Sequence, residues 1–483
     1  MSSVRLRPLI AALLAFVPLV AGCGGNEPGS AAADFAPPDV AMFVTVNTDF
    51  ESGQWDAVRD LVAKFPDGDR AVDFVREALR DEGIDFEEDV KPALGPEVGL
   101  VVLDFQAETF VAFTQPRDEA KLKQVLETGD EPAATRMVDG WMLAADDQAT
   151  LDQFEEARKA GSLSDSEDFQ DAMSTVSDDA LATLYFSGKG LQQAFQSDQE
   201  VPSGVYDTFF PGGVPAIAFS VRAEPDGVRV EGGGRYDSKG FSSPYEAKLP
   251  EEVPAGAFAY FSFNDLGSLF SEFRDAFSQG DPEFERSIGQ LEGMLGLSLE
   301  EDIAPLFAHE GAFYVRGGAP IPEFTLVLNV DDPEKSVATL DKLVSGLRAF
   351  SPQVPVPRET EISGVTAKEL PLGFPVSLYY AGFDGHLVVT SARSGIADLR
   401  ADGDRLVDDP VFQDAREAAD MPDETTGFLY VNLHDLVPFV LGYLEGTDLA
   451  EEVRSNLEPL RYLLVYGAQD GDTNRFSAFL AIE

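Results

Sequence analysis

The chain has 483 residues, and its 35 Lys and Arg against 86 Asp and Glu give a net charge of −51 at pH 7. This charge argues against nucleic-acid binding, which needs a basic surface that releases counterions, and against a polybasic contact with anionic lipid. With 44% hydrophobic and 10% aromatic residues, the chain has ample material for a core, which argues against intrinsic disorder.

The first 22 residues have the pattern of a secretory signal peptide. Arg5 and Arg7 give a positive start, and an apolar run over residues 9–20 follows, interrupted by Pro18. A membrane-spanning helix needs about 20 apolar residues, so this run is too short to be one. No later segment is long and apolar enough either, and we predict no transmembrane helix.

The single cysteine, Cys23, comes directly after this run. Residues 20–23 (VAGC) resemble the lipobox of bacterial lipoproteins, which implies cleavage before Cys23 and a diacylglyceryl group on its sulfur. The alternative is an ordinary signal peptide with a free thiol nearby. We expect lipid anchoring at the extracytoplasmic face of the cell membrane, because two or more acyl chains hold a protein stably. Residues 23–38 would then be the acylated cysteine and a flexible tether.

The rest of the chain has the pattern of a tandem duplication. Residues 83–92 (GIDFEEDVKP) match residues 296–305 (GLSLEEDIAP), and the tetrapeptide FQDA at 169–172 recurs at 412–415. Further short matches follow in the same order. A repeated order of this kind indicates two homologous halves, residues 39–245 and 250–483.

In chain order, each half opens with an apolar strand, at residues 40–46 and 257–263. Two amphipathic helices follow, near residues 55–65 and 74–79 in the first half and 266–277 and 284–295 in the second. Next comes a strand pair, at 98–105 with 109–114 and at 311–315 with 324–330. A helix is then predicted to begin after Asp118 or Asp332.

The later part of each half contains two predicted hairpins around a central strand. The strands are at 181–186 and 427–431, and Asp-Gly pairs at 139–140, 226–227, 384–385 and 470–471 mark the turns. Hairpins favour antiparallel pairing. The sequence therefore predicts an α+β fold, a tandem duplication of an α+β unit with mainly antiparallel sheets and helices packed on one face.

Two segments resemble a known family. Residues 37–43 (PPDVAMF) and 86–98 (FEEDVKPALGPEV) are similar to the recurring motifs of the domain-of-unknown-function 3352 family. The resemblance covers most of the mature chain and implies a bacterial extracytoplasmic protein, often with a lipoprotein signal. It supplies no catalytic residue.

Three acidic segments are candidate cation sites, since Ca²⁺ prefers carboxylate oxygens. For Glu87-Glu88-Asp89 and its copy Glu300-Glu301-Asp302, we favour capping of a short helix over metal binding. Residues 470–474 (DGDTN) begin like a calcium loop but lack its later glycine and glutamate, so a hairpin turn is favoured. The acidic residues at 402–409 are interpreted as a solvated loop.

No sequence motif indicates catalysis. His309, His386 and His434 are scattered, and no zinc-protease, serine-hydrolase or phosphate-loop motif occurs. The run Gly232-Gly233-Gly234 ends a strand without a following helix, so it indicates a turn or a strand irregularity. A Ser-His-Asp triad is kept as an alternative, because folding can bring together residues that are far apart in the sequence. We expect no catalytic, cofactor or metal residue, and lipidation at Cys23.

We therefore favour a non-enzymatic, lipid-anchored envelope protein that binds a protein or a cell-wall polymer, without nucleic acid. A second hypothesis is a solute-binding lipoprotein with its ligand between the two halves, which a cleft lined by aromatic and polar groups would support. A third is a carboxylate- or metal-dependent hydrolase, which convergent acids of raised pKa would support. The net negative charge has two interpretations: it keeps a secreted protein soluble, or it keeps the protein away from anionic lipid and cell-wall polymers.

Overall fold

The computed structural model describes residues 30–81, 83–128, 133–196, 210, 213–236, 243–280, 282–318, 321–373, 376–442 and 448–483. The predicted signal peptide and Cys23 lie outside these residues. Within the described part, no helix is both long and apolar enough to cross a membrane.

The first half of the chain forms strands β1 to β8. Its strands are β1 (Met42–Asn47), β2 (Glu97–Asp104), β3 (Thr109–Thr114), β4 (Ala134–Val138), β5 (Trp141–Ala145), β6 (Ala182–Phe186), β7 (Ile217–Glu224) and β8 (Gly227–Arg235). Its helices are α2 (Ser30–Phe35), α3 (Gly53–Ala63), α4 (Gly68–Asp81), η1 (Phe86–Val90), α5 (Glu119–Glu127), α6 (Gln148–Arg158), η2 (Leu163–Asp165), α7 (Glu167–Met173) and α8 (Gly188–Gln196).

The second half forms strands β9 to β20. Its strands are β9 (Tyr245–Glu246), β10 (Ala257–Asn264), β11 (Glu310–Arg316), β12 (Glu323–Asn329), β13 (Arg358–Ile362), β14 (Val365–Gly373), β15 (Val376–Phe383), β16 (His386–Thr390), β17 (Glu424–Thr425), β18 (Gly427–Asn432), β19 (Leu460–Asp470) and β20 (Thr473–Ile482). Its helices are η3 (Leu249–Glu251), α10 (Leu266–Gly280), α11 (Pro282–Leu295), η4 (Leu299–Ile303), η5 (Ala304–Phe307), α12 (Pro333–Phe350), α13 (Ser394–Arg400), η6 (Leu406–Asp408), α14 (Pro410–Ala418), α15 (Leu433–Gly442) and α16 (Asp448–Leu457).

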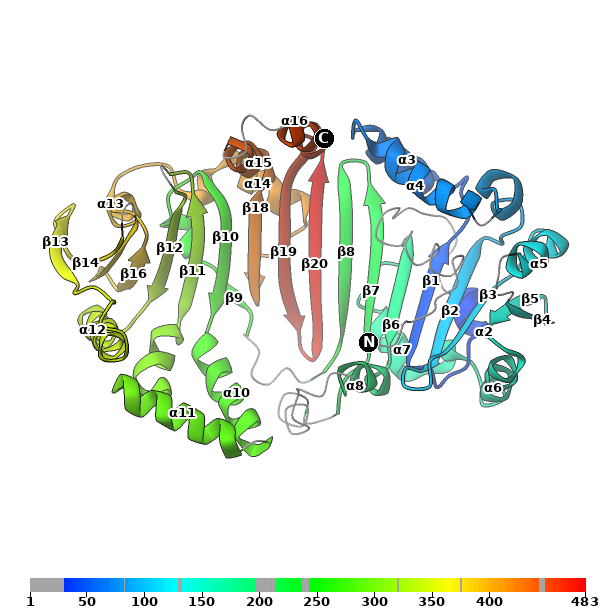
Figure 1. The fold of residues 1–483 in the computed structure, drawn as a ribbon, viewed down its shortest axis with the longest axis horizontal. Coiled ribbons are helices and arrows are strands. Elements are labelled where there is room, and N and C mark those ends of the chain that lie inside the picture. The colour runs from blue at the N-terminus through cyan, green and yellow to red at the C-terminus, as the bar shows by residue number, and fades with distance from the viewer. Residues whose placement is uncertain are drawn as a thin grey trace.

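Eighteen strands of the described residues join in one antiparallel sheet, and β9 pairs separately with β17 (Figure 1). The spatial order in the sheet is β13-β14-β15-β16-β12-β11-β10-β18-β19-β20-β8-β7-β6-β1-β2-β3-β5-β4. The predicted α+β class with mainly antiparallel pairing is confirmed.

The two halves follow the same strand order from the centre of the sheet outward. From β8, the first half runs β7, β6, β1, β2, β3, and from β20 the second half runs β19, β18, β10, β11, β12. The duplication stays a prediction, and this matching connectivity is what it would produce. The second half adds the hairpin β13–β14 at its outer edge.

The halves meet where β8 pairs with β20 over nine residue positions, from Arg235 opposite Thr473 to Gly227 opposite Ala481. Arg229 on β8 is buried and bonds across this junction to the carbonyl oxygens of Ala418 and Ala419 at the end of α14, at 2.6 and 2.9 Å. Since the sheet continues through the junction, these two strands leave no cleft between the halves.

One predicted boundary is corrected by the structure. The tether was predicted to extend to residue 38, but residues 30–35 form helix α2, whose Ala32 and Ala33 are buried. Phe35 stacks on Trp141 with ring centroids 4.9 Å apart, and Arg158 lies over its other side. Alanine favours helix, and its small side chain lets α2 approach the sheet closely.

Candidate functional site

The two faces of the sheet differ in what covers them. Tyr260 on β10 and Tyr314 on β11 are both fully buried, in a core formed with α13 and α14. Their chain neighbours Phe261 and Phe313 point to the opposite side, because side chains alternate along a strand. These phenylalanines are 42% and 40% exposed. We call the first side the helix-covered face and the second side the open face.

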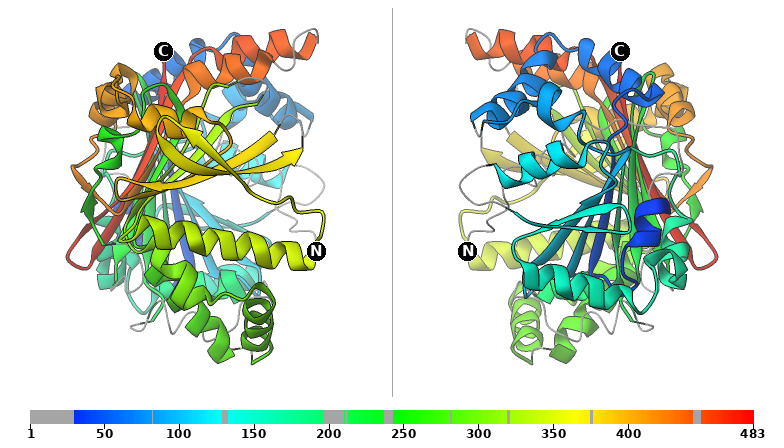
Figure 2. Two further views of the ribbon diagram at one scale, coloured as in Figure 1. Left: turned by 90° about the vertical axis from the view of Figure 1, so that its left-hand side faces the viewer. Right: turned by 90° about the vertical axis from the view of Figure 1, so that its right-hand side faces the viewer.

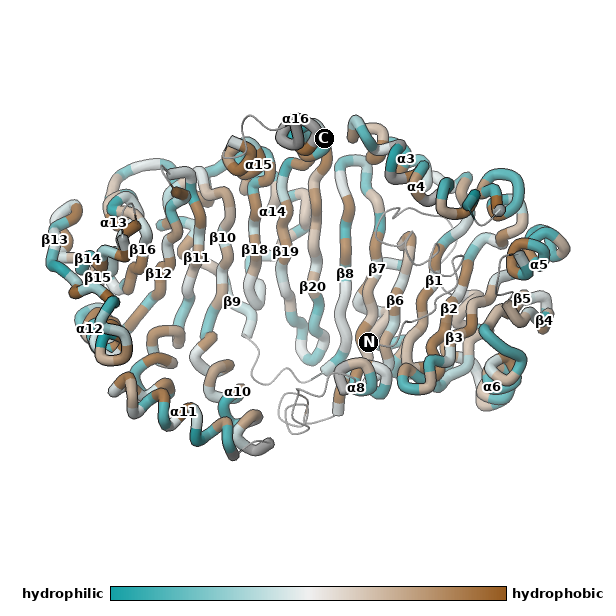
Figure 3. The backbone as a smooth tube through the Cα atoms, viewed as in Figure 1, coloured by the Kyte–Doolittle hydropathy of each residue, from teal (hydrophilic) through white to brown (hydrophobic). Residues whose placement is uncertain are grey.

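Apolar side chains occupy the open face in continuous cross-strand rows. One row, read through the strand register from β12 to β1, is Leu326, Phe313, Phe261, Leu429, Val465, Ala478, Val230, Val221, Ala182 and Val46. A second row is Phe324, Val315, Ala259, Val431, Leu463, Leu480, Val228 and Ala223. Figure 3 shows the matching apolar segments along the central strands, with hydrophilic residues more frequent in the helices and turns. Neither row contains a polar side chain.

Among the described residues, helices cover the outer parts of the open face, where α4, η1 and α5 pack over Val98 and Met142. Helix α3 packs through Trp55, Val58 and Leu61 near β7 and β8, and η5 packs through Leu306 near Phe263. In the side views of Figure 2, helices α10 to α12 and helices α15 and α16 extend from opposite ends of the strands toward one side of the sheet. They flank the open face, on which Phe261, Phe313 and Phe324 are 40–43% exposed.

A path of phenylalanine rings crosses the second half of this face. Phe324 lies 6.4 Å from Phe313, measured between ring centroids, and Phe313 is directly opposite Phe261 in the strand register. Phe261 lies 5.6 Å from Phe263, and the path continues through Phe307 to Phe270 on α10, with centroid distances of 6.4 and 6.0 Å. We call these six residues the phenylalanine path.

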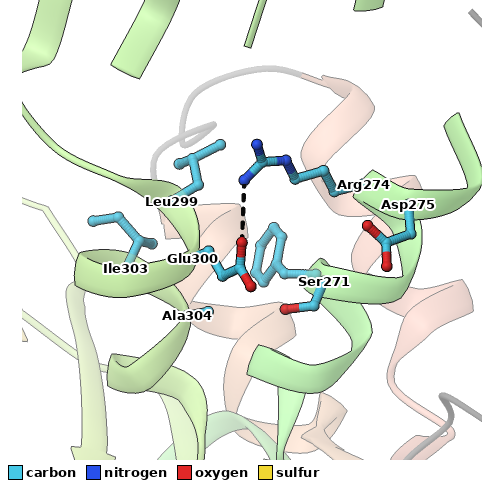
Figure 4. A pocket seen from close by; sticks show the side chains of 8 residues that line it. Ser271, Arg274, Asp275, Leu299, Glu300, Ile303 and Ala304 are labelled. Atoms are coloured by element: carbon cyan, nitrogen blue, oxygen red, sulfur yellow. Dashed lines mark ion pairs between the residues drawn. The ribbon is translucent and has the colours of Figure 1, made fainter. Parts of the chain in front are cut away.

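The phenylalanine path ends at a pocket between α10 and η4 (Figure 4). Its lining residues are Phe270, Ser271, Arg274, Asp275, Leu299, Glu300, Ile303 and Ala304. Half of this lining is apolar and half is polar. The pocket therefore shares Phe270 with a chain of ring contacts that reaches the open face through the buried Phe263.

Carboxylates surround the cation of this pocket. Arg274 contacts Glu285 at 2.8 Å, Glu300 at 3.6 Å and Glu292 at 3.7 Å. The hydrogen bond to Glu285 is the main cause of the raised pKa of Arg274, and the same bond lowers the pKa of Glu285. With Asp275 also in the lining, the pocket carries net negative charge.

The two acidic motifs lie inside short helices, not before them as predicted, and only their last residues, Asp89 and Asp302, take part in capping. Asp85 accepts hydrogen bonds from the amides of Glu87 and Glu88 at the start of η1. In the copy, Ser298 caps η4 and the carboxylate of Asp302 accepts from the amide of Ser298 at 3.0 Å, as Asp89 does from Asp85 at 2.9 Å. These paired bonds resemble a capping box.

The other candidate cation segments have structural roles. Asp470 and Thr473 pair across a two-residue hairpin turn, with Gly471 at a φ of 62°. In the 402–409 segment, Asp409 caps α14 through the amides of Val411 and Phe412. The described residues contain no group of three His, Cys, Asp or Glu side chains placed to hold a metal ion.

The three histidines stay in separate polar contacts. His309 faces Asp331 at 3.1 Å, and His434 faces Asp435 at 2.9 Å. His386 lies between Asn329 and Glu252. Burial raises the pKa of Glu310, which accepts hydrogen bonds from the backbone amides of Lys248 and Leu249.

Sequence reasoning missed both the open face and the pocket. The available signal was the run FAYFSF at residues 258–263, in which apolar residues fill both alternating sets of positions. A strand that is apolar on both sides is typical of burial on two faces. In an antiparallel sheet with helices over the centre of only one face, such a run instead indicates an apolar surface that faces solvent or a ligand.

Comparisons with known proteins give one family. The family described as "Protein of unknown function (DUF3352)" matches residues 114–482, and no curated protein matches. Crystal form III of TP0453 is similar over 48% of this chain and 79% of its own, with 15% identity and a TM-score of 0.24. Crystal form I is similar over 49% and 95%, with 15% identity and a TM-score of 0.23. Such low TM-scores carry no argument about this chain.

Proposed function

The chain belongs to the DUF3352 family, whose description assigns no function, and we propose that it is a lipid-anchored, non-enzymatic binding protein of the bacterial envelope. In this proposal the open face holds the acyl chains of a lipid. The observation that carries it is the exposure of Phe261, Phe313 and Phe324, at 40–43%, on an otherwise apolar sheet face. With Phe270 at 56%, these four residues expose roughly 350 Å² of ring surface, taking ~200 Å² for each residue. The largest apolar patch on a typical monomer has about this size and is often functional.

The chemistry of the open face favours an acyl chain as the occupant. Strands β10, β11 and β18 each pair with a neighbouring strand on both sides. Their backbone N–H and C=O groups are therefore used in the sheet and are not offered to a ligand. The side chains of the two rows offer no hydrogen bond. An acyl chain needs none, because it has neither donors nor acceptors, and each buried CH₂ contributes about 0.8 kcal/mol.

The size of the open face fits the same occupant. The six strands from β12 to β20 span roughly 24 Å at the usual strand spacing. An acyl chain reaches across half of a bilayer core, or roughly 15 Å. A second copy of this chain is a poorer occupant, because two bodies that each carry a net charge of −51 repel one another.

Native mass spectrometry of the protein, extracted gently from its own membrane, tests this proposal. We expect a lipid mass in addition to the anchor, and loss of that mass in Phe313→Ser. Covering the exposed part of this ring contributes about 2 kcal/mol, or roughly thirtyfold in affinity. Phe74→Ser is the matched control, because Phe74 is 69% exposed on α4 and is not part of the phenylalanine path. A clean acylated monomer, or a bound protein chain in place of lipid, would contradict the acyl-chain assignment.

The same spectra test the anchor. We expect a mass that begins at Cys23 with acyl groups attached, and we expect Cys23→Ala to move the protein from the detergent phase to the aqueous phase in a detergent partition assay. An intact segment 1–22 in the purified protein would refute lipidation.

A further inference from the structure

The pocket between α10 and η4 lies where the phenylalanine path leaves the sheet. Phe270 belongs to both, since its ring is 6.0 Å from that of Phe307 and it also lines the pocket. A molecule whose apolar part follows the path reaches the polar side chains Ser271, Arg274 and Asp275 only at this end. This is the arrangement that an amphiphile requires, with its polar group at one end of an apolar chain.

We propose that this pocket receives the polar headgroup of the bound lipid and selects headgroups without net negative charge. The inference rests on the proposed acyl-chain function and adds the class of lipid to it. Zwitterionic or cationic headgroups that carry an ammonium group fit this site, and anionic phosphate headgroups without one do not.

The charged side chains of the pocket explain why it would select against anionic headgroups. Arg274 is the only cation in the lining, and its guanidinium already contacts Glu285, Glu292 and Glu300. A phosphate bound there would compete with these carboxylates for Arg274 and would lie close to Asp275. An ammonium group instead meets several carboxylates at short range, where opposite charges attract by a few kcal/mol at most in partly exposed sites.

The surrounding elements have the same sign of charge. Helices α10 and α11 and segment η4 contain eight acidic residues and two arginines, as their sequences show. The second arginine, Arg286, already lies 3.5 Å from Glu283. The described flank of the pocket therefore repels anions and attracts cations within a Debye length of about 10 Å.

A competition experiment tests the headgroup assignment. The acylated protein is incubated with equal amounts of lysophosphatidylcholine and lysophosphatidylglycerol of identical acyl chain, and native mass spectrometry measures how much of each it retains. We expect about tenfold more of the choline lipid, a preference that shrinks at high salt because charge interactions are screened. The double variant Asp275→Asn, Glu300→Gln should retain both lipids with a ratio near one.

The control variant is Glu301→Gln, because Glu301 is the exposed neighbour of Glu300 and does not line the pocket. It should keep the preference of the natural protein. Equal retention by the natural protein, or a preference for the glycerol lipid, would overturn the headgroup assignment and leave acyl-chain binding standing. Retention of neither lipid would overturn the proposed function itself. If Glu301→Gln changes the lipid ratio as much as the double variant does, the preference comes from overall charge, and the role of the pocket is overturned.

Discussion

Replacing Arg229 by methionine should weaken the junction of the two halves more than any surface substitution. Arg229 Nε lies 2.6 Å from a carboxylate oxygen of Glu224, and its Nη atoms donate to the carbonyl oxygens of Ala418 and Ala419. Its side chain is 4% exposed. Removing one member of a buried, bonded charge pair costs about 3–5 kcal/mol. Here the helix carbonyls lose their donors, and Glu224 keeps only its ion pair with Arg222 at 3.0 Å. This cost is a large part of the 5–15 kcal/mol that is typical of a folded domain.

The assay is urea unfolding followed by tryptophan fluorescence and by circular dichroism. Both tryptophans, Trp55 and Trp141, lie in the first half, whereas circular dichroism reports both halves. Arg229→Met should lower the midpoint in both signals. Arg235→Met is the control, since Arg235 is on the same strand and also bridges the halves, through Asp171 and Asp472, but is 49% exposed. Such a surface pair contributes about 0–1 kcal/mol. Equal midpoint shifts for the two variants would refute the reasoning.

Three more predictions concern stability. Gly232→Val should cost about 1–3 kcal/mol in urea unfolding, because an added Cβ would lie 2.3 Å from the Phe476 ring, whereas Gly403→Ala, with open space around it, should be neutral. Asp302→Ala should cost about 1 kcal/mol near neutral pH through the lost capping bond, and this difference should vanish in acid once the natural carboxylate is protonated below its lowered pKa. Burial raises the pKa of Glu310, so the natural protein should lose stability as pH rises from the usual carboxyl value through that raised pKa. Glu310→Gln should remove this slope, and parallel pH profiles for the two proteins would contradict it.

Local signals predicted the elements of the fold well. The strand expected at 109–114 is β3 with the same bounds. Asp118 and Asp332, predicted to start helices, accept hydrogen bonds from the amides of Lys121 and Lys335. The Asp-Gly pairs at 139–140 and 384–385 have positive φ at both residues, as the predicted hairpin turn requires.

Long-range pairing could not be predicted in the same way. The register between β8 and β20 joins residues that lie 238 to 254 positions apart, and periodicity gives no partner for a strand. The hairpin β13–β14 was missed because Arg358–Ile362 carries alternating charges and forms an edge of the sheet. Its turn residues Ser363 and Gly364, both with positive φ, were the available signal.

The pocket and the open face could not be predicted from the sequence, because sequence patterns do not show which helices cover which part of the sheet. The acidic motif at 300–302 was interpreted as a cap, a role that Asp302 alone takes, whereas Glu300 lines the pocket beside Arg274. That second role arises because α10 folds back against η4, a contact between segments about 25 residues apart. The open face was hidden for a similar reason, since a phenylalanine in an apolar strand has the same pattern whether or not a helix covers it.

The central position of β8 has a consequence for the order in which the chain is made. Strand β8 closes the first half, but its partner β20 is the last strand of the chain. Until β20 has been synthesised, β8 is an unpaired edge, and such edges invite association with other chains. A fragment that ends before β9 should therefore form dimers through β8, and addition of a peptide with the β20 sequence should dissociate them.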